Sequence, residues 1–459
     1  MKEQIFERFS PGTAYTENMT RLFPLLAGLL LFPVFQTEAA EKYSIIPEPE
    51  KTELKRNATR TLKLLSDKTS PALGKDAYRL AVTPQGVHLA SGGREGRMYG
   101  LVTLQQLQDQ LAAQPEGIPC GVITDKPRYP WRGMMVDPAR HFIPIKDLKK
   151  FVDLMAYYKF NKLHVHLTDN QGWRLPVPGH NQALHAAYSE FFCFPKPDMK
   201  VRTVAGNSKE LVCPQKPEVW KFYAAVFKEL KDIFPSNTVH LGGDEAPTEL
   251  WKKCPLCREA RTKAGMKDEQ EQMRAFFAKM TALLDKNGQT PQFWYEGNAG
   301  IYHPGETVYA WRQDQARQAI EKTKKAGLNL IMASNEYCYL DFPQFPGQYN
   351  WGWMQTTTLQ KCYELDPAFG KSTAEAGHIR GVHAPVWAEH LPDLNHLLYR
   401  VYPRAMALAE AGWSPMEVRS WENFQRKVAD HRPFVLKRFN YDLKRTKDNE
   451  PPFRWENKK

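Results

Sequence analysis

The sequence lacks an apolar stretch long enough to span a membrane. Its apolar run at residues 22–35 is shorter than the ~20 residues that a spanning helix needs, but it fits the apolar region of an export signal. Residues 1–18 are polar and acidic, whereas a start at Met19 gives a normal signal that ends in the small-residue stretch 37–40. We predict a signal peptide at 1–40 and a periplasmic or secreted protein. Without a cysteine near the cleavage site, no membrane anchor is expected.

The chain also lacks a concentrated basic segment. Its 63 Lys and Arg against 51 Asp and Glu give a net charge of +12, but the excess is spread along the sequence. Basic runs such as residues 322–325 fall in expected helices, where a solvated polar face explains them. We therefore expect no nucleic-acid partner.

A second Cys-x-x-Cys pair is absent too. Cys254 and Cys257 have the spacing of half a zinc site, but no second pair or matching His pair follows at the expected distance. For Cys254 and Cys257 we therefore favour a local disulfide or two free thiols over a zinc site. No metal or organic cofactor is predicted. The seven cysteines are an odd number, which fits an exported protein with some disulfides and at least one free thiol.

A chain of 459 residues can hold one large domain and a small one. We predict a small α/β domain at 41–127, with a hairpin at 78–82 and 86–89 and a helix at 97–111. Beyond it, at 128–450, apolar strands alternate with amphipathic helices, as in a parallel (β/α) barrel. One such helix places apolar residues at helical spacing from Val219 to Ile233. The expected barrel strands are 131–136, 162–167, 238–242, 292–296, 308–311, 329–333 and 381–387.

Two adjacent carboxylates, Asp244 and Glu245, follow one of these strands. Neighbouring side chains of a strand point to opposite faces, so both reach one ligand only if the backbone leaves the pleat, which Gly242 and Gly243 permit. Two close carboxyl groups cannot both ionise freely, so one pKa rises and that group can donate a proton near neutral pH. In this context the pair predicts acid/base chemistry. An Asp-Glu dipeptide without such a context would be interpreted as part of a solvated loop.

The run HLGGDE at 240–245 resembles the signature of glycoside hydrolase family 20, the β-N-acetylhexosaminidases. Further segments are similar to the family's in the same order along the chain. These are WRG at 131–133, DPARHF at 137–142, NKLHVHLTDNQGWR at 161–174, FWYE at 293–296, VYAWR at 308–312, YLD at 339–341 and VWAE at 386–389. The resemblance implies a TIM-type (β/α)8-like barrel preceded by a small α/β domain.

One element of this pattern is missing. The family carries several tens of residues, including the third barrel strand, between its Gln-Gly-Trp-Arg and Pro-Gly-His elements. Here residues 171–174 run almost directly into residues 178–180. We therefore predict a barrel that lacks its third strand or is disrupted there.

The resemblance also implies a substrate-assisted mechanism, in which the sugar's own acetamido oxygen is the nucleophile. Glu245 would be the general acid and base, Asp244 would hold the acetamido N–H, and Tyr339 would grip the acetamido oxygen. The residues expected to bind substrate are Arg140, Asp169, His180, Trp294, Trp311, Asp341, Trp387 and Glu389. Asp169 and His180 match a pair that tunes the acid, and His164 and His166 are expected to be strand residues with satisfied hydrogen bonds. Cys193 and Cys213 match a cysteine pair of relatives, which implies a disulfide.

The sequence thus predicts an exo-acting β-N-acetylhexosaminidase that acts on glycans or glycoconjugates, releasing terminal β-linked N-acetylglucosamine. Release of N-acetylgalactosamine is left open. One alternative is a non-catalytic carbohydrate-binding protein derived from this enzyme, and another is a disaccharide-releasing relative. Intact Asp244, Glu245 and Tyr339 favour the enzyme.

Overall fold

The computed structural model describes residues 43–169, 171–177, 189–194, 211–350 and 352–451. The predicted signal peptide at 1–40 and His180 lie outside the described residues. In the described part of the chain, no helix combines the length and the apolar character that crossing a membrane would require.

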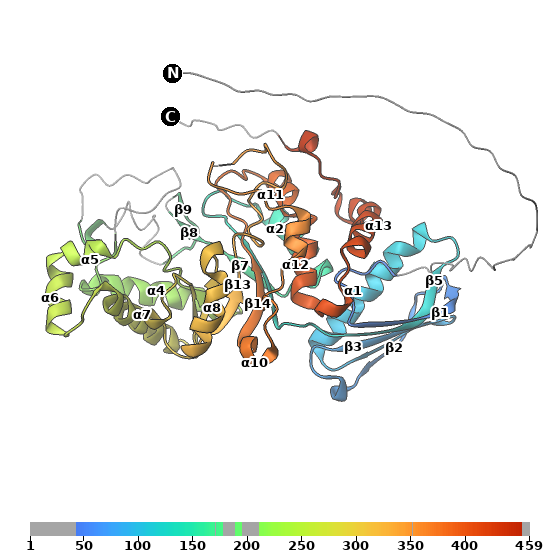
Figure 1. The fold of residues 1–459 in the computed structure, drawn as a ribbon, viewed down its shortest axis with the longest axis horizontal. Coiled ribbons are helices and arrows are strands. Elements are labelled where there is room, and N and C mark those ends of the chain that lie inside the picture. Colours follow the sequence, from blue (N-terminus) through green and yellow to red (C-terminus); the bar gives the residue numbers. More distant parts are fainter. Residues whose placement is uncertain (1–42, 170, 178–188, 195–210, 351, 452–459) are drawn as a thin grey trace, which may run out of the picture. The chain divides into compact units, whose positions relative to one another are not determined.

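The N-terminal domain is one sheet covered by a helix (blue to cyan in Figure 1). Its elements are β1 (Lys51–Thr59), β2 (Leu64–Thr69), β3 (Tyr78–Thr83), β4 (Gly86–Ser91), α1 (Arg94–Gln110) and β5 (Ile118–Asp125). The sheet order is β1-β5-β3-β4-β2, and β3 and β4 form the predicted antiparallel hairpin. Helix α1 packs on β3 and β4 and buries Leu104 and Leu107 against the sheet.

The second sheet is parallel throughout, and all seven predicted barrel strands are present in it. They are β6 (Trp131–Val136), β7 (Lys162–Val165), β10 (Thr238–His240), β11 (Thr290–Trp294), β12 (Thr307–Ala310), β13 (Asn329–Met332) and β14 (Ile379–Ala384). Their order is β10-β11-β12-β13-β14-β6-β7. Strand β6 is buried along almost its whole length, because helices cover one face of the sheet and the other face lies toward the barrel interior. The curled sheet confirms the predicted TIM-type fold class.

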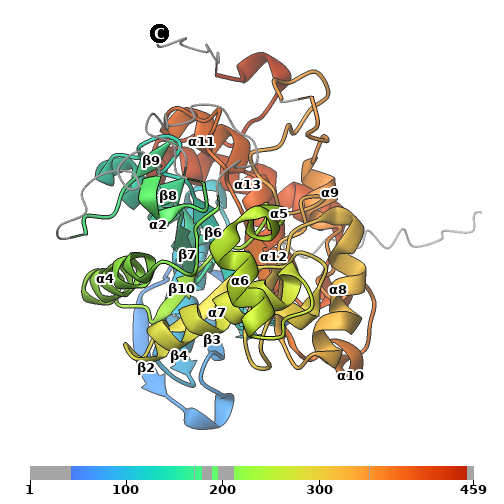
Figure 2. The same ribbon diagram turned by 90° about the vertical axis from the view of Figure 1, so that its left-hand side faces the viewer.

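Helices follow or alternate with these strands, and several of them pack on the outside of the sheet. They are α2 (Ile145–Tyr157), α4 (Pro217–Ile233), α5 (Glu249–Lys253), α6 (Pro255–Lys263), α7 (Glu269–Asp285), α8 (Gln313–Lys325), α9 (Leu359–Tyr363), α10 (Thr373–Ala376), α11 (Leu394–Val401), α12 (Arg404–Trp413) and α13 (Trp421–Phe439). Figure 2 faces the side covered by α4, α7 and α8; α7 contacts β11, and α8 contacts β12 and β13. The predicted apolar helix is α4, although its last residue, Ile233, is exposed because it lies at the helix end.

The sheet is open between β7 and β10, where the third strand was predicted to be missing. Among the described residues no strand joins these two edges, so the predicted disruption is confirmed. A two-stranded hairpin of β8 (Thr168–Asp169) and β9 (Gly172–Trp173) follows β7 instead. Leu175, Val177, Phe191 and Phe192 of the irregular chain then pack against α4 and Val239 of β10. Apolar packing therefore covers an edge that strand pairing would otherwise close.

The small domain and the barrel share a buried polar network. The ammonium of Lys159, between α2 and β7, lies 3.1 Å from Asp125 Oδ2 at the end of β5. It also donates to the Tyr78 hydroxyl at 2.9 Å and lies 4.3 Å from the ring centre of Trp413. The indole N–H of Trp413 donates to Asp125 Oδ1 at 2.9 Å. Each charge is matched by an opposite charge or a donor, as a buried ion requires.

This network gives a stability prediction. Lys159→Met should lower the free energy of unfolding by about 3–5 kcal/mol, because Asp125 would stay buried without its cation. Lys149→Met on the exposed face of α2 is the matched control, with an expected change within about 0.5 kcal/mol. Urea unfolding followed by tryptophan fluorescence measures both variants. Equal midpoints for the two would contradict the assigned role of Lys159.

Candidate active site

The two carboxylates stand on a loop that leaves the sheet at the end of β10. Gly242 and Gly243 have φ values of 72° and 92°, and Glu245 has a φ of 50°. A Cβ on Gly243 would lie 2.6 Å from the ring of Phe277, so the loop also approaches α7 too closely for a side chain. The predicted departure from the pleat is therefore real, and it needs glycine for both conformation and space.

Both carboxyl groups have raised pKa values. Asp244 is half-buried, and loss of hydration raises its pKa to about 6, with smaller contributions from Glu296 and Glu245. Glu245 has 42% of its side chain exposed; partial burial raises its pKa, against the lowering effect of Arg312. The site thus holds a half-buried carboxyl group beside a more exposed one.

Glu296 and Arg312 belong to this site, although no role was predicted for them from the sequence. Arg312 Nη2 lies 3.2 Å from Glu296 Oε2 and 3.8 Å from Glu245 Oε1. The indole N–H of Trp311 donates to Glu296 Oε1 at 2.9 Å. Glu296 and Arg312 lie close to strand ends, in segments that resemble those of the family. That position is the signal from which they could have been predicted.

Four aromatic side chains form a wall at the carboxyl ends of the strands. Tyr339 lies 6.4 Å from both Trp311 and Trp387, measured between ring centres, and Trp294 lies 6.0 Å from Trp387. Burial raises the pKa of Tyr339 well above its ordinary value, with further contributions from Asp341, Asp244 and Glu245. The Tyr339 hydroxyl therefore remains protonated and can donate a hydrogen bond.

Arg140 lies against Trp387 and is surrounded by acidic groups. Its guanidinium lies 2.9 Å from Asp169, 3.2 Å from Asp137 and 3.7 Å from Glu389. It also lies 5.0 Å from the ring centre of Trp387. Several partners fix its orientation, which suits a group that must present N–H donors to a ligand.

Two acidic side chains keep an oxygen without a partner. Asp341 Oδ2 and Glu389 Oε2 are buried and make no hydrogen bond within the described residues. Burial raises the pKa of Asp341 well above its ordinary value and also raises that of Glu389, the latter against the opposing effect of Arg140. Since buried polar atoms are normally satisfied, these two oxygens have hydrogen-bonding positions left for a polar ligand.

The histidine predictions have mixed outcomes. His166 Nε2 pairs with Asp169 at 2.9 Å and lies 3.3 Å from Arg140, so its expected satisfaction is confirmed. His164 Nδ1 has no partner among the described residues, so that expectation is wrong for His164. Its ring lies inside the barrel and stacks 4.9 Å from His240. Asp169 thus contacts Arg140 and His166, whereas its predicted partner His180 is outside the described residues.

A cavity of about 540 Å³ opens beside these groups. Its lining includes the site residues Arg140, Asp169, Asp244, Trp294 and Trp387. It continues between β7 and β10 to apolar residues of α4, through the position of the missing strand. The volume is in the range typical of small-molecule sites.

The cysteines differ from the prediction. All seven cysteines are free thiols. The disulfide predicted between Cys193 and Cys213 is therefore wrong. Cys193 and Cys213 instead lie with Cys254 and Cys257 in one buried group, described below.

Neighbouring carboxylates of raised pKa in an aromatic-walled cavity, at the carboxyl ends of barrel strands, are typical of a glycoside hydrolase. Comparison with protein families agrees. Residues 129–177 and 175–416 match "Glycosyl hydrolase family 20, catalytic domain", and residues 36–126 match "Glycosyl hydrolase family 20, domain 2". The chain belongs to glycosyl hydrolase family 20. The match to the catalytic domain breaks at 175–177, next to the gap between β7 and β10 in the described part of the chain.

Individual relatives extend over the same length. A beta-hexosaminidase of Akkermansia muciniphila is 72% identical over 493 aligned positions, covering 96% of this chain and 100% of the relative. A crystal structure of a beta-N-acetylhexosaminidase is 74% identical, with a TM-score of 0.89 over 90% of this chain and 100% of that one. A family 20 exo beta-N-acetylglucosaminidase of Vibrio harveyi shares the fold at 21% identity, with a TM-score of 0.74 over 87% of this chain and 78% of that chain.

Proposed function

We propose that this protein is an exo-acting β-N-acetylhexosaminidase that releases terminal β-linked N-acetylglucosamine from glycans, with N-acetylgalactosamine as an open alternative. The observation that carries the proposal is the Asp244–Glu245 pair beside the protonated Tyr339 hydroxyl and the aromatic wall. The names of the two relatives that exceed 70% identity support it.

In the proposed reaction the substrate's acetamido oxygen attacks its own anomeric carbon. Tyr339 donates a hydrogen bond to that oxygen, and Asp244 accepts from the acetamido N–H and offsets the developing positive charge. Glu245, at the accessible side of the pair, protonates the leaving oxygen and later deprotonates water. Water opens the cyclic intermediate, so the product keeps the β configuration. Because no protein nucleophile is required, orientation of the acetamido group supplies much of the rate.

The groups around Arg140 are suited to hold the sugar ring. Its guanidinium offers donors to ring hydroxyls, and the unpartnered oxygens of Asp341 and Glu389 can accept from them. Trp294, Trp311 and Trp387 offer apolar faces to the acetamido methyl and the ring. The sugar would thereby fill hydrogen-bonding positions that the protein alone leaves open.

We further propose that the protein is exported, with glycans as its partners and with neither a membrane anchor nor a nucleic-acid partner. The apolar run at 22–35 before a small-residue stretch supports export, and the dispersed positive charge argues against a nucleic-acid site. N-terminal sequencing of the protein from the cell envelope or medium tests this. A first residue near Glu41 is expected, whereas an intact N-terminus in the cytoplasm would contradict export.

Two aryl substrates test the proposed function. The protein should hydrolyse p-nitrophenyl N-acetyl-β-glucosaminide but not p-nitrophenyl β-glucoside, because the glucoside has no acetamido group to act as nucleophile. Proton NMR of the first reaction should show the β-anomer as initial product. An α-anomer formed first would overturn the mechanism, and binding without hydrolysis would favour the carbohydrate-binding alternative. Release of disaccharides from a chito-oligosaccharide would favour the disaccharide-releasing alternative.

A further inference from the structure

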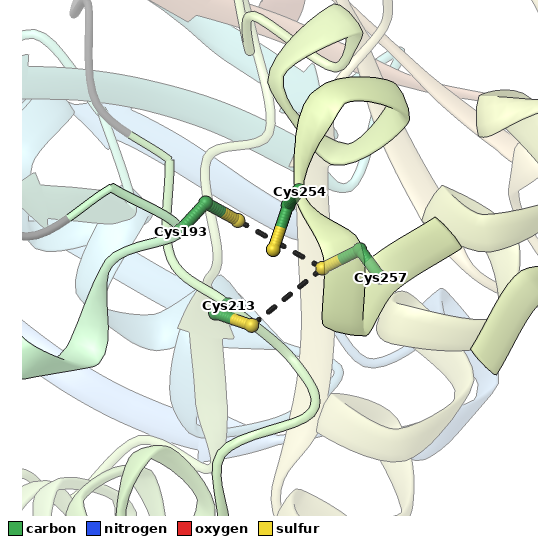
Figure 3. A group of neighbouring side chains, drawn as sticks. All are labelled: Cys193, Cys213, Cys254 and Cys257. Carbon is green, nitrogen blue, oxygen red and sulfur yellow. Dashed lines mark hydrogen bonds between the residues drawn. The ribbon is translucent and has the colours of Figure 1, made fainter. Parts of the chain in front are cut away.

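Four cysteines from three chain segments converge on one point outside the sugar site. Figure 3 shows Cys193, Cys213, Cys254 and Cys257 with their sulfurs pointing toward one another. All four sulfurs lie within 4.8 Å of one another, and each side chain is buried. The Cys257 sulfur lies 3.8 Å from that of Cys193 and 3.6 Å from that of Cys213.

Backbone hydrogen bonds hold the first two cysteines in place. The Cys193 N–H donates to Leu211 O at 2.9 Å, and the Cys213 N–H donates to Phe191 O at 2.8 Å. These bonds form a short antiparallel pairing around residues 192 and 212. It brings two single cysteines side by side, as a Cys-x-x-Cys turn would.

The other two cysteines are placed by helix α6. Cys254 is its N-cap residue and Cys257 lies in its first turn, so both sulfurs face the same side. The sequence argued against zinc because no second pair of ligands follows Cys257. Cys193 and Cys213, which precede Cys254 in the chain, supply that second pair.

We propose that these four thiolates bind one structural zinc ion. Zinc in a closed protein site is tetrahedral with Zn–S bonds of about 2.3 Å, which places the sulfurs about 3.8 Å apart. The two sulfur–sulfur distances given above, 3.8 Å and 3.6 Å, agree with that edge. A disulfide needs sulfurs about 2.05 Å apart, so the cysteines would have to shift to form one. With four protein ligands no position remains for water or substrate, so the role is structural.

The position of the site indicates what it stabilises. Two ligands lie on the irregular chain near the gap between β7 and β10, and that chain supplies Phe191 and Phe192 to the apolar packing there. The other two follow α5, which comes directly after the loop of Asp244 and Glu245. The indole N–H of Trp251 in α5 donates to Val212 O at 2.9 Å, next to Cys213. Zinc would therefore tie the chain beside the gap to the segment after the carboxylate loop.

Metal content and spectroscopy test this proposal in the full-length protein without reference to activity. Elemental analysis after gel filtration should find about one zinc ion per chain, as one closed site requires. An organomercurial should release it to a chromogenic chelator as the thiols are titrated. Cobalt exchanged into the protein should show the intense thiolate-to-cobalt absorption of a tetrahedral four-sulfur site, which carboxylate ligands would not give.

Cysteine variants give the matched comparison. Cys257→Ser should lose the zinc and the cobalt spectrum, whereas Cys362→Ala, at an equally buried cysteine outside the group, should keep both. If Cys257→Ser does not fold, the wild-type protein provides the test. Removing its zinc should lower the melting temperature, and adding zinc back should restore it. Intact thiols without metal, disulfides among the four cysteines, or iron in place of zinc would each overturn the proposal.

Discussion

Glu245→Gln should reduce kcat/KM for chitobiose by about 10²–10⁴-fold, the usual contribution of general acid catalysis. The loss with p-nitrophenyl N-acetyl-β-glucosaminide should be far smaller. A sugar alkoxide is a poor leaving group and needs a proton as the bond breaks, whereas p-nitrophenolate leaves without one. The exposed side chain of Glu245 fits contact with the leaving sugar.

The measurement is kcat/KM for both substrates, because this ratio reports the step in which the leaving group departs. Glu249→Gln, at an exposed glutamate at the start of α5, is the control and should keep wild-type rates. Equal losses of Glu245→Gln on the two substrates would show that Glu245 is not the proton donor.

The second large effect is expected for Asp244→Asn, which should slow both substrates by similar factors of about 10²–10³. Asp244 is proposed to act on the acetamido group, whose attack is required whatever the leaving group. An amide can hold that group in place but cannot offset its positive charge. A leaving-group dependence like that of Glu245→Gln would contradict this division of roles.

The pH profile gives an independent check on Asp244. Its pKa is raised to about 6, and the proposed role needs the ionised form, so wild-type kcat/KM should fall as the pH drops below about 6. The Asp244→Asn variant has no such group to titrate, so its residual activity should lose this acid limb. An unchanged limb in the variant would assign the titration to another group.

Stability should change in the opposite direction to activity. A folded-state pKa above the unfolded value of about 3.9 means that the native state binds the Asp244 proton more tightly. The stability from this group is complete below about pH 4 and is lost as the pH rises through about 6. Asp244→Asn avoids this loss, so its thermal midpoint should equal or exceed that of the wild type at pH 7. A large decrease there would indicate a structural role instead.

Much of the fold was predictable because its signals are local. Each barrel strand is a short apolar run, and α1 and α4 repeat their apolar residues at helical spacing. The gap that the described residues leave between β7 and β10 was equally visible, because a deletion shortens the distance between two recognisable segments. The residues of the site were predicted because they lie in segments that resemble the family. Trp294 is the last residue of β11, whereas Tyr339 and Asp341 follow β13 by several residues.

What the sequence by itself determined is therefore the class of fold, the position of the gap and the carboxylate pair with its aromatic wall. Tertiary structure alone decided the contacts between segments far apart in the chain. Arg312 meets Glu245 and Glu296 because three strands end at one edge, and Asp169 turns toward Arg140. Backbone pairing brings Cys193 and Cys213 beside each other, and the folded chain places them next to Cys254 and Cys257. Spacing along the chain records local geometry, whereas these partners are set by how the strands and loops pack in space.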